Sequence, residues 1–275
     1  MPTVALSPAR SRRPSGRGGS RPRRQPGRGR APRGRARARR RALRFLLSVA
    51  VLLAAVLAAL LLGDRSTGTT YPVTAAQLAQ ARADLAALPV VDTPRAPAYD
   101  RDAFGPAWAD VDRNGCDTRN DVLARDLTAV TFKPGTRDCV VLSGRLADRY
   151  TGQGIDFRRG QDTSSLVQVD HVVALADAWR SGAHAWTAEE RTRFANDPQN
   201  LLAVDGAANQ DKGAASADAW LPPQRGYRCR YVATQVSVKA RWALSVTTAE
   251  RRAIARTLDS CVTVETQITS AHPHL

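Results

Sequence analysis

Hydrophobic and polar residues alternate between positions 167 and 171, where the sequence is VQVDH. Val167 and Val169 would face a core while the polar residues face the other way, and this pattern predicts a β-strand that ends at His171. A second apolar run at 201–204 predicts the return strand, and the polar segment that follows it predicts a helix. The expected order is therefore strand, strand, helix.

Helix and strand signals on both sides of this unit predict a mixed α+β fold. Thr74 and Gln77 have the spacing of a capping box, and the helix after them places apolar residues on one face. That face would either pack on the domain or form a weak dimerisation seam, so the oligomeric state stays open. Further helices are predicted at 120–127, at 174–180, after Thr187, at 231–243 and at 248–261, with short strands near Thr131 and at 139–142.

The positive charge of the chain is concentrated at its start. Residues 1–44 contain 16 Arg, no Lys and no acidic residue, whereas the whole chain has 41 basic and 25 acidic residues. The remainder therefore balances 25 basic against 25 acidic residues. This composition predicts a disordered cytoplasmic tail, and it means that the high overall pI is no sign of nucleic-acid binding by the globular part.

An uncharged apolar segment at 45–62 predicts a transmembrane helix. At about 1.5 Å per residue it would reach roughly 27 Å, enough to cross a bilayer core. The Arg residues before it place its start in the cytoplasm, so everything after Gly63 would lie outside. We expect a single-pass signal anchor in the cell membrane. A cleaved signal peptide, which would release a secreted protein, and a looser twin-arginine signal are the alternatives.

Four cysteines, all after the apolar segment, agree with an external location. They contain no C-x-x-C pair, so zinc binding is not expected. Four cysteines allow three connectivities, and we choose the sequential one because each bridge then closes a local loop. The expected disulfides are Cys116–Cys139 and Cys229–Cys261.

Three side chains near the ends of the predicted strands and helix suit the hydrolysis of a phosphodiester. The reaction needs a cation to neutralise charge on the phosphate and a base whose pKa lies near neutrality. Asp170 can supply a carboxylate oxygen and Asn209 an amide oxygen, which are ligands that Mg²⁺ or Mn²⁺ accepts. His171 lies beside a carboxylate and suits the role of general base.

The ordered set Asp-His-Val-Val at 170–173, Asn-Leu-Leu at 200–202 and Asn-Gln-Asp-Lys-Gly at 209–213 resembles the HNH endonuclease motif. That family has a β-hairpin capped by a helix around one metal ion. The similarity extends to the secreted or surface-anchored HNH proteins common in actinobacteria and covers about residues 95–262. The further strings that carry it are Tyr99-Asp100-Arg101, Phe104-Gly105, Trp108, NGCDTRND at 114–121 and WLPP at 220–223.

The resemblance implies a role for each residue of the motif. His171 matches the general base, Asp170 the first metal ligand, and Asn209 the metal-binding residue on the helix, where many members have His. Asn200 matches the Asn that braces the loop between the strands. Lys212 would lie near the substrate phosphate.

Two further sites are suggested by the residues themselves. Arg158 and Arg159 directly follow Ile155-Asp156-Phe157 and would meet substrate phosphates, although a solvated loop pair is an equal alternative. Asp110, Asp112 and Asn114 resemble the start of a Ca²⁺ loop, for which a turn before a helix is the alternative.

We therefore expect a metal-dependent HNH endonuclease with a ββα-metal core, additional helices and short strands. It would cleave nucleic acid, for which we favour DNA, outside the cytoplasmic membrane. The alternative is a non-catalytic envelope protein that uses the ββα scaffold to bind nucleic acid or a surface partner, which a neutral domain favours. The expected parts are a tail (1–44), a membrane segment (45–63), a helix and linker (64–98), the nuclease domain (99–262) and a C-terminal tail (263–275).

Overall fold

The computed structural model describes residues 43, 45–53, 71–161 and 163–264. The chain divides into two units, Met1–Arg65 and Ser66–Leu275, and only the second contains the residues of the predicted site. In the first unit, residues 45–53 are helical. Within the described residues no helix is both long and apolar enough to cross a membrane, so the transmembrane helix predicted at 45–62 has no support there. Its residues 54–62, like most of the predicted tails at 1–44 and 263–275, lie outside the described residues.

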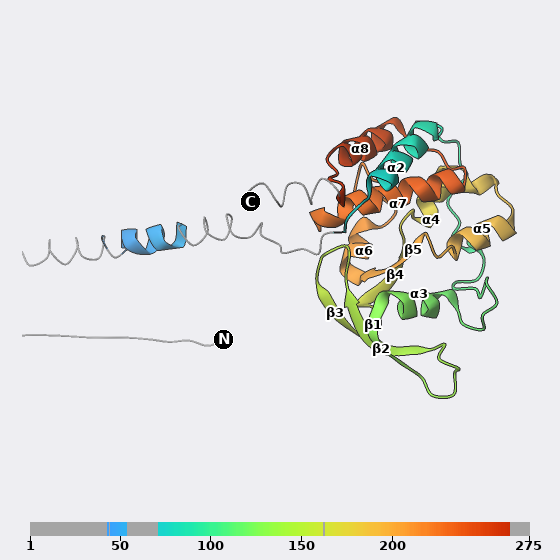
Figure 1. Ribbon diagram of the computed structural model, residues 1–275, viewed down its shortest axis with the longest axis horizontal. Helices are drawn as coiled ribbons and strands as arrows, with labels where there is room; N and C mark the ends of the chain where they lie inside the picture. The colour runs from blue at the N-terminus through green and yellow to red at the C-terminus, as the bar shows by residue number, and fades with distance from the viewer. Residues whose placement is uncertain (1–42, 44, 54–70, 162, 265–275) are drawn as a thin grey trace, which may run out of the picture. The chain divides into compact units, whose positions relative to one another are not determined.

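The unit that begins at residue 66 combines helices with two small antiparallel sheets, which confirms the predicted α+β class. Figure 1 labels these elements. The helices are α2 (Ala75–Ala87), α3 (Thr118–Asp126), α4 (Leu175–Arg180), α5 (Ala188–Ala195), α6 (Gly206–Lys212), α7 (Arg228–Arg241) and α8 (Thr248–Asp259). The strands are β1 (Leu127–Phe132), β2 (Val141–Ala147), β3 (Gly154–Arg158), β4 (Val167–His171) and β5 (Leu201–Asp205). Single 3₁₀ turns lie at Asp102–Phe104, Ala183–Ala185 and Arg225–Tyr227.

Strands β4 and β5 form an antiparallel hairpin that is followed directly by α6. His171 pairs with Leu201 and Val167 pairs with Asp205. Helices α4 and α5 fill the insertion between the two strands, and α5 begins with the capping box predicted at Thr187. The expected order of strand, strand and helix is therefore present.

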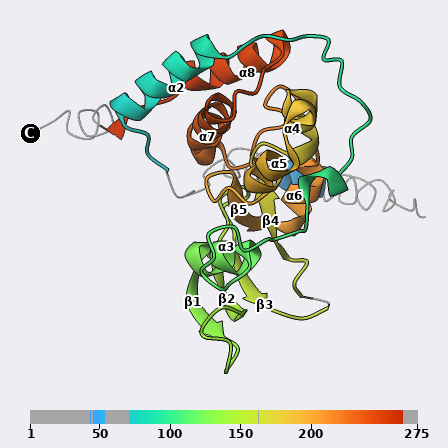
Figure 2. The same ribbon diagram turned by 90° about the vertical axis from the view of Figure 1, so that its right-hand side faces the viewer.

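The hairpin lies between a layer of helices and the three-stranded sheet, as both views show (Figures 1 and 2). Because side chains alternate along a strand, β5 contributes to two cores. Leu202 and Val204 pack with α2, α7 and α8, whereas Leu201 and Ala203 pack with α3 and the β1–β2–β3 sheet. Both faces of β5 are thus covered, which explains why β5 is apolar at consecutive positions.

Helix α2 packs on α7 and α8 within its own domain. Its N-terminus has the predicted Thr74 capping box, and its apolar face, including Leu78 and Leu85, is buried in the helical core. Arg251 of α8 donates hydrogen bonds to carbonyls at the C-terminal end of α2. The apolar face is therefore occupied by the domain, and the alternative of a dimerisation seam on it is wrong.

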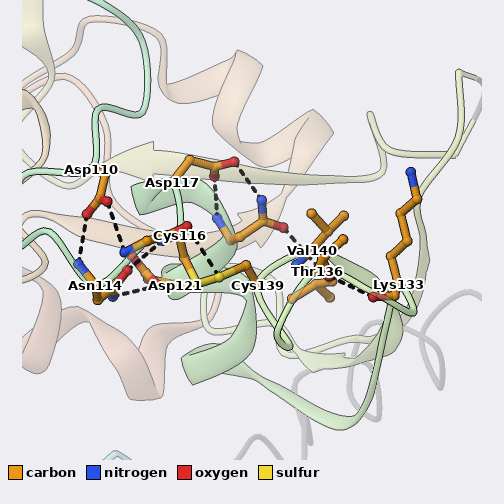
Figure 3. The surroundings of a disulfide bond; sticks show 12 residues. Asp110, Asn114, Cys116, Asp117, Asp121, Lys133, Thr136, Cys139 and Val140 are labelled. Carbon is orange, nitrogen blue, oxygen red and sulfur yellow. Dashed lines mark hydrogen bonds between the residues drawn. A yellow bond between two sulfur atoms is a disulfide. The ribbon is translucent and has the colours of Figure 1, made fainter.

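Both predicted disulfides are confirmed. Cys116 is bonded to Cys139, and Cys229 is bonded to Cys261. The first joins the loop before α3 to the loop before β2 (Figure 3), and the second joins α7 to the end of α8. Each bridge closes a local loop and so removes conformations from the unfolded chain.

A buried ion network joins the helices behind the hairpin. The Lys239 ammonium on α7 lies 3.0 Å from a carboxylate oxygen of Asp177 on α4 and 2.6 Å from one of Glu250 on α8. All three residues are buried. Burial of charge is costly unless the partners are in place, so this network fixes α4 relative to α7 and α8.

Lys239→Met should lower the free energy of unfolding of the full chain by about 3 kcal/mol or more, because it leaves two buried carboxylates without their cation. Arg145→Met is the matched control: Arg145 pairs with Asp156 on the surface at 3.3 Å, and its loss should cost less than about 1 kcal/mol. Denaturant unfolding measures both. Equal effects of the two substitutions would contradict the structural role of the network.

Candidate active site

A cavity of about 510 Å³ lies beside the hairpin, and three of the predicted motif residues, Asp170, His171 and Asn209, line it. Four consecutive residues of β4, from Gln168 to His171, line it together with Asn209 of α6 and the start of α4. The opposite wall is formed by the segment 99–108 and by Arg119 of α3. The cavity therefore brings together three parts of the chain that are far apart in sequence.

His171 ends β4 with its imidazole ring held by one hydrogen bond and one ring contact. Its Nε2 atom lies 2.7 Å from the carbonyl oxygen of Ala195, and its ring stacks on Trp108 with 6.0 Å between centroids. A carbonyl can only accept, so Nε2 carries the proton and neutral His171 has its lone pair on Nδ1. No residue in the described part of the chain donates a hydrogen bond to Nδ1.

Burial lowers the pKa of His171 to about 4. Desolvation of the imidazolium is the main cause, and the nearby positive charges of Lys212 and Arg101 add to it, while the hydrogen bond to Ala195 opposes the shift. His171 is consequently neutral at pH 7, the protonation state in which Nδ1 can accept a proton.

Asp170 is buried on the other face of β4, where two side chains bind its carboxylate. The Lys212 ammonium lies 2.9 Å from Oδ1, and the Tyr150 hydroxyl donates to Oδ2 at 2.6 Å. Burial raises the pKa of Asp170, and these two donors oppose that rise. Tyr150 is itself held in an aromatic cluster with Trp220, Tyr227 and Tyr231.

Lys212 lies elsewhere than expected from the resemblance. Its side chain is fully buried, and its ammonium donates to Asp170 and to the carbonyl oxygen of His171, at 2.8 Å for the latter. Residues three apart on a helix share a face, so the face of α6 that bears Asn209 and Lys212 lies over β4. Lys212 therefore fixes the carboxylate of Asp170 and does not face the substrate cavity.

Asn209 reaches the cavity because α6 begins directly at the end of β5. The Asp205 side chain caps the helix, and Gly206 allows close approach, since a Cβ there would lie 2.0 Å from the carbonyl oxygen of Ser165. The Asn209 amide nitrogen donates to the side-chain oxygen of Gln168 at 2.8 Å. This contact orients the amide and leaves its oxygen to accept another ligand.

Asn200 is fully buried and braces the turn after His171. Its side-chain oxygen accepts from the backbone N–H of Val173 at 2.7 Å, and its amide nitrogen donates to the carbonyl of the same residue at 3.1 Å. Its backbone carbonyl accepts from Val172 at 2.8 Å. Asn200 thus fixes the backbone conformation of the loop after His171, and its side chain does not line the cavity.

Two residues that line the cavity carry oxygen atoms of the kind that Mg²⁺ accepts. Asp170 and Asn209 offer oxygen atoms, and each Asp170 oxygen has a second lone pair besides the one engaged by Lys212 or Tyr150. In the described residues no three His, Cys, Asp or Glu side chains are grouped to hold a metal. Mg²⁺ does not need such a group, because it commonly takes one or two protein oxygens with water and substrate phosphate.

The two arginines predicted to bind substrate do not line this cavity. Arg159 is engaged in the fold, where it donates to the carbonyl of Val141 and to the side chain of Asn120. Arg158 is exposed at the end of β3. The cationic wall is instead formed by Arg101 and Arg119. Both lie in strings that carry the HNH resemblance, so that signal was present in the sequence.

The loop that resembles a Ca²⁺ site is a hydrogen-bonded turn beside the first disulfide (Figure 3). Asp110 accepts hydrogen bonds from the backbone N–H groups of Asn114 and Gly115, and Asp112 also accepts from Asn114. The Asp117 side chain caps α3. These are the bonds of the turn that was the alternative interpretation, and we do not propose a calcium site.

Comparisons with known proteins give one family and one related sequence. The family described as GmrSD restriction endonucleases, C-terminal domain, matches residues 117–257, just over half of the chain. An uncharacterized secreted protein from Arthroderma benhamiae is 39% identical over 165 residues, which are 59% of this chain and 76% of that protein. No solved structure matches the chain. The family match contains every residue of the predicted motif, from Asp170 to Lys212.

The depressed pKa of His171 predicts a pH-dependent contribution to stability. Unfolded His titrates near 6.5, so between about pH 4 and 6.5 the unfolded state binds more protons than the folded state. The stability due to neutral His171 is therefore complete above pH 6.5 and is lost as the pH falls toward 4. We expect the unfolding free energy of the wild-type chain, relative to that of His171→Gln, to decrease as the pH falls from 6.5 to 4, when both proteins are measured in chelator. A difference that does not change with pH would contradict the buried environment of the imidazole.

Proposed function

Because the chain belongs to the family of GmrSD restriction endonucleases, C-terminal domain, we propose that it is a nuclease that hydrolyses phosphodiester bonds of DNA by the HNH mechanism. Nuclease activity follows from the family, and the HNH assignment is our own. The observation that supports it most directly is His171, a neutral imidazole with its Nδ1 lone pair unused at the wall of a cavity. Asp170 and Asn209 line the same cavity.

In this proposal His171 is the general base. Its Nε2–H donates to Ala195, and this fixes the tautomer, so that Nδ1 takes the proton from the attacking water. The pKa of about 4 keeps the imidazole unprotonated at neutral pH, but it lies below the near-neutral value expected from the sequence and makes His171 a weaker base. The contact with Trp108 and the hydrogen bond to Ala195 together hold the ring in one orientation, which a base needs for efficient proton transfer.

Asp170 and Asn209 would hold one divalent cation, Mg²⁺ or Mn²⁺, which when bound stabilises negative charge on the phosphate and the leaving oxygen. The remaining polar residues position these two ligands. Lys212 and Tyr150 fix the carboxylate of Asp170, and Gln168 orients the amide of Asn209. Asn200 keeps the chain after His171 in place.

The proposed site of action is outside the cytoplasm. The chain has two disulfides, which persist in oxidising compartments, and the Arthroderma benhamiae relative is described as a secreted protein.

His171→Ala should lower the rate of plasmid DNA cleavage in Mg²⁺ by at least about 10²-fold, because the general base is lost. His184→Ala is the matched control: His184 hydrogen-bonds to the carbonyl of Trp179 and does not line the cavity, so this variant should retain activity. A His171→Ala protein that cleaves at the wild-type rate would refute the proposed mechanism. Inactive wild-type protein would favour the non-catalytic alternative.

Chelator should abolish cleavage, and either Mg²⁺ or Mn²⁺ should restore it. Asp170→Asn and Asn209→Ala should each weaken Mn²⁺ binding, measured by calorimetry, by at least about 10-fold. The exposed carboxylate of Asp156 on β3 gives the control, Asp156→Asn, which should bind Mn²⁺ like the wild type. Binding that is unaffected by both site substitutions would place the cation elsewhere.

A further inference from the structure

Four side chains that line the cavity come from outside the ββα unit, and the proposed chemistry uses only the contact of one of them, Trp108, with His171. Tyr99 and Trp108 are aromatic, and Arg101 and Arg119 are cationic. Tyr99 is 40% exposed, and Trp108 is partly buried. An aromatic surface and two guanidinium groups in one cavity are the two kinds of group that bind single-stranded nucleic acid.

Arg119 contributes a second cation to the lining of the cavity. It is partly buried and lies over the Phe157 ring, with 6.0 Å from its guanidinium carbon to the ring centroid. In the part of the chain that the structure describes, its guanidinium makes no ion pair or hydrogen bond. Burial and the nearby Arg159 lower its pKa, and the charge of Asp117 opposes this shift without forming an ion pair with Arg119. A phosphate bound here would supply the missing counter-charge.

Trp108 is held in a costly backbone conformation at the same wall. Its φ is 60°, which is rare for a bulky residue, and such strain is found mainly where the surrounding structure or a function requires it. The indole lines both the main cavity and a smaller one of about 120 Å³ formed with Phe104 and Gly105, and it contacts the His171 ring. This places an aromatic surface directly beside the proposed base.

We propose that this cavity binds one unpaired nucleotide of the strand being cut, with its base on Trp108 and Tyr99 and its phosphate on Arg119 and Arg101. The inference rests on the proposed nuclease function and narrows its substrate class to single-stranded or locally unpaired DNA. The faces of paired bases are covered in a duplex, so recessed aromatic side chains can stack only on a base that has left the helix. A cavity of about 510 Å³ is within the usual size range for small-ligand pockets.

The same arrangement explains how a domain with balanced charge could act on a polyanion. Residues 45–275 carry 25 basic and 25 acidic side chains, so no overall positive field attracts the backbone of a long duplex. Two arginines concentrated at the cavity give local attraction for one or two phosphates instead. Binding would then depend on stacking as much as on charge.

The test compares kcat/KM of the full chain for a single-stranded oligonucleotide and for the same sequence as a duplex. The single strand should be cleaved at least about 10-fold faster, because a flipped base in a duplex costs unpairing energy. Trp108→Leu should reduce this ratio by about 10-fold or more, whereas Trp108→Phe should keep most of it, because phenylalanine still provides a stacking face. Arg119→Gln should raise KM for the single strand, and Arg145→Gln on the exposed surface of β2 should not.

The decisive quantity is the ratio of kcat/KM for the single strand to kcat/KM for the duplex, because partial misfolding of a variant lowers both values equally. A wild-type ratio near one, or a ratio unchanged by Trp108→Leu, would overturn the inference while leaving the nuclease function intact. Loss of the ratio in Trp108→Leu alone, with Trp108→Phe retaining it, supports the inference. Absence of cleavage of both substrates by the wild type would refute the proposed function and, with it, the inference.

Discussion

The buried ion pair between Lys212 and Asp170 is the interaction on which the site depends. It joins the last turn of α6 to β4 at 2.9 Å, and the same ammonium also binds the carbonyl of His171. A desolvated ion pair is stable only when its polar atoms have further partners, and Tyr150 supplies one to Asp170. This pair fixes the position of α6 against β4. Asn209 lies three residues earlier on the same helix face, so its position is fixed as well.

The supports of the site come from elements on both sides of the hairpin. Gln235 of α7 donates to the carbonyl of Val172, and Arg125 of α3 donates to the carbonyl of Leu201, so both strands of the hairpin are anchored at their ends near His171. Trp220 packs against Tyr150, which holds Asp170. The proposed site residues are thus positioned by helices and strands, whereas the 99–108 segment that also lines the cavity is loop apart from one 3₁₀ turn.

The local elements of the site could be predicted from sequence because their signals are local. The alternation at 167–171 places His171 at the end of a strand. The ordered motif places Asn209 on a helix, and the capping boxes mark the starts of other helices. Tyr150 could not be assigned in this way, since it reaches the site only through the packing of elements distant in sequence. The contacts of Lys212 could not be predicted for a related reason. The spacing gives its helix face, but only the tertiary structure shows that a buried carboxylate lies below that face.

The first and last described segments of the 66–275 unit are paired with each other. Val73 forms a parallel bridge with Thr263, and the N–H of Val264 donates to the carbonyl of Val73. Chain ends that leave a domain side by side let it be fused or inserted as a module without strain on its interior. The domain can therefore be joined to unrelated neighbours, which accords with a family description that places it at the C-terminal end of restriction endonucleases.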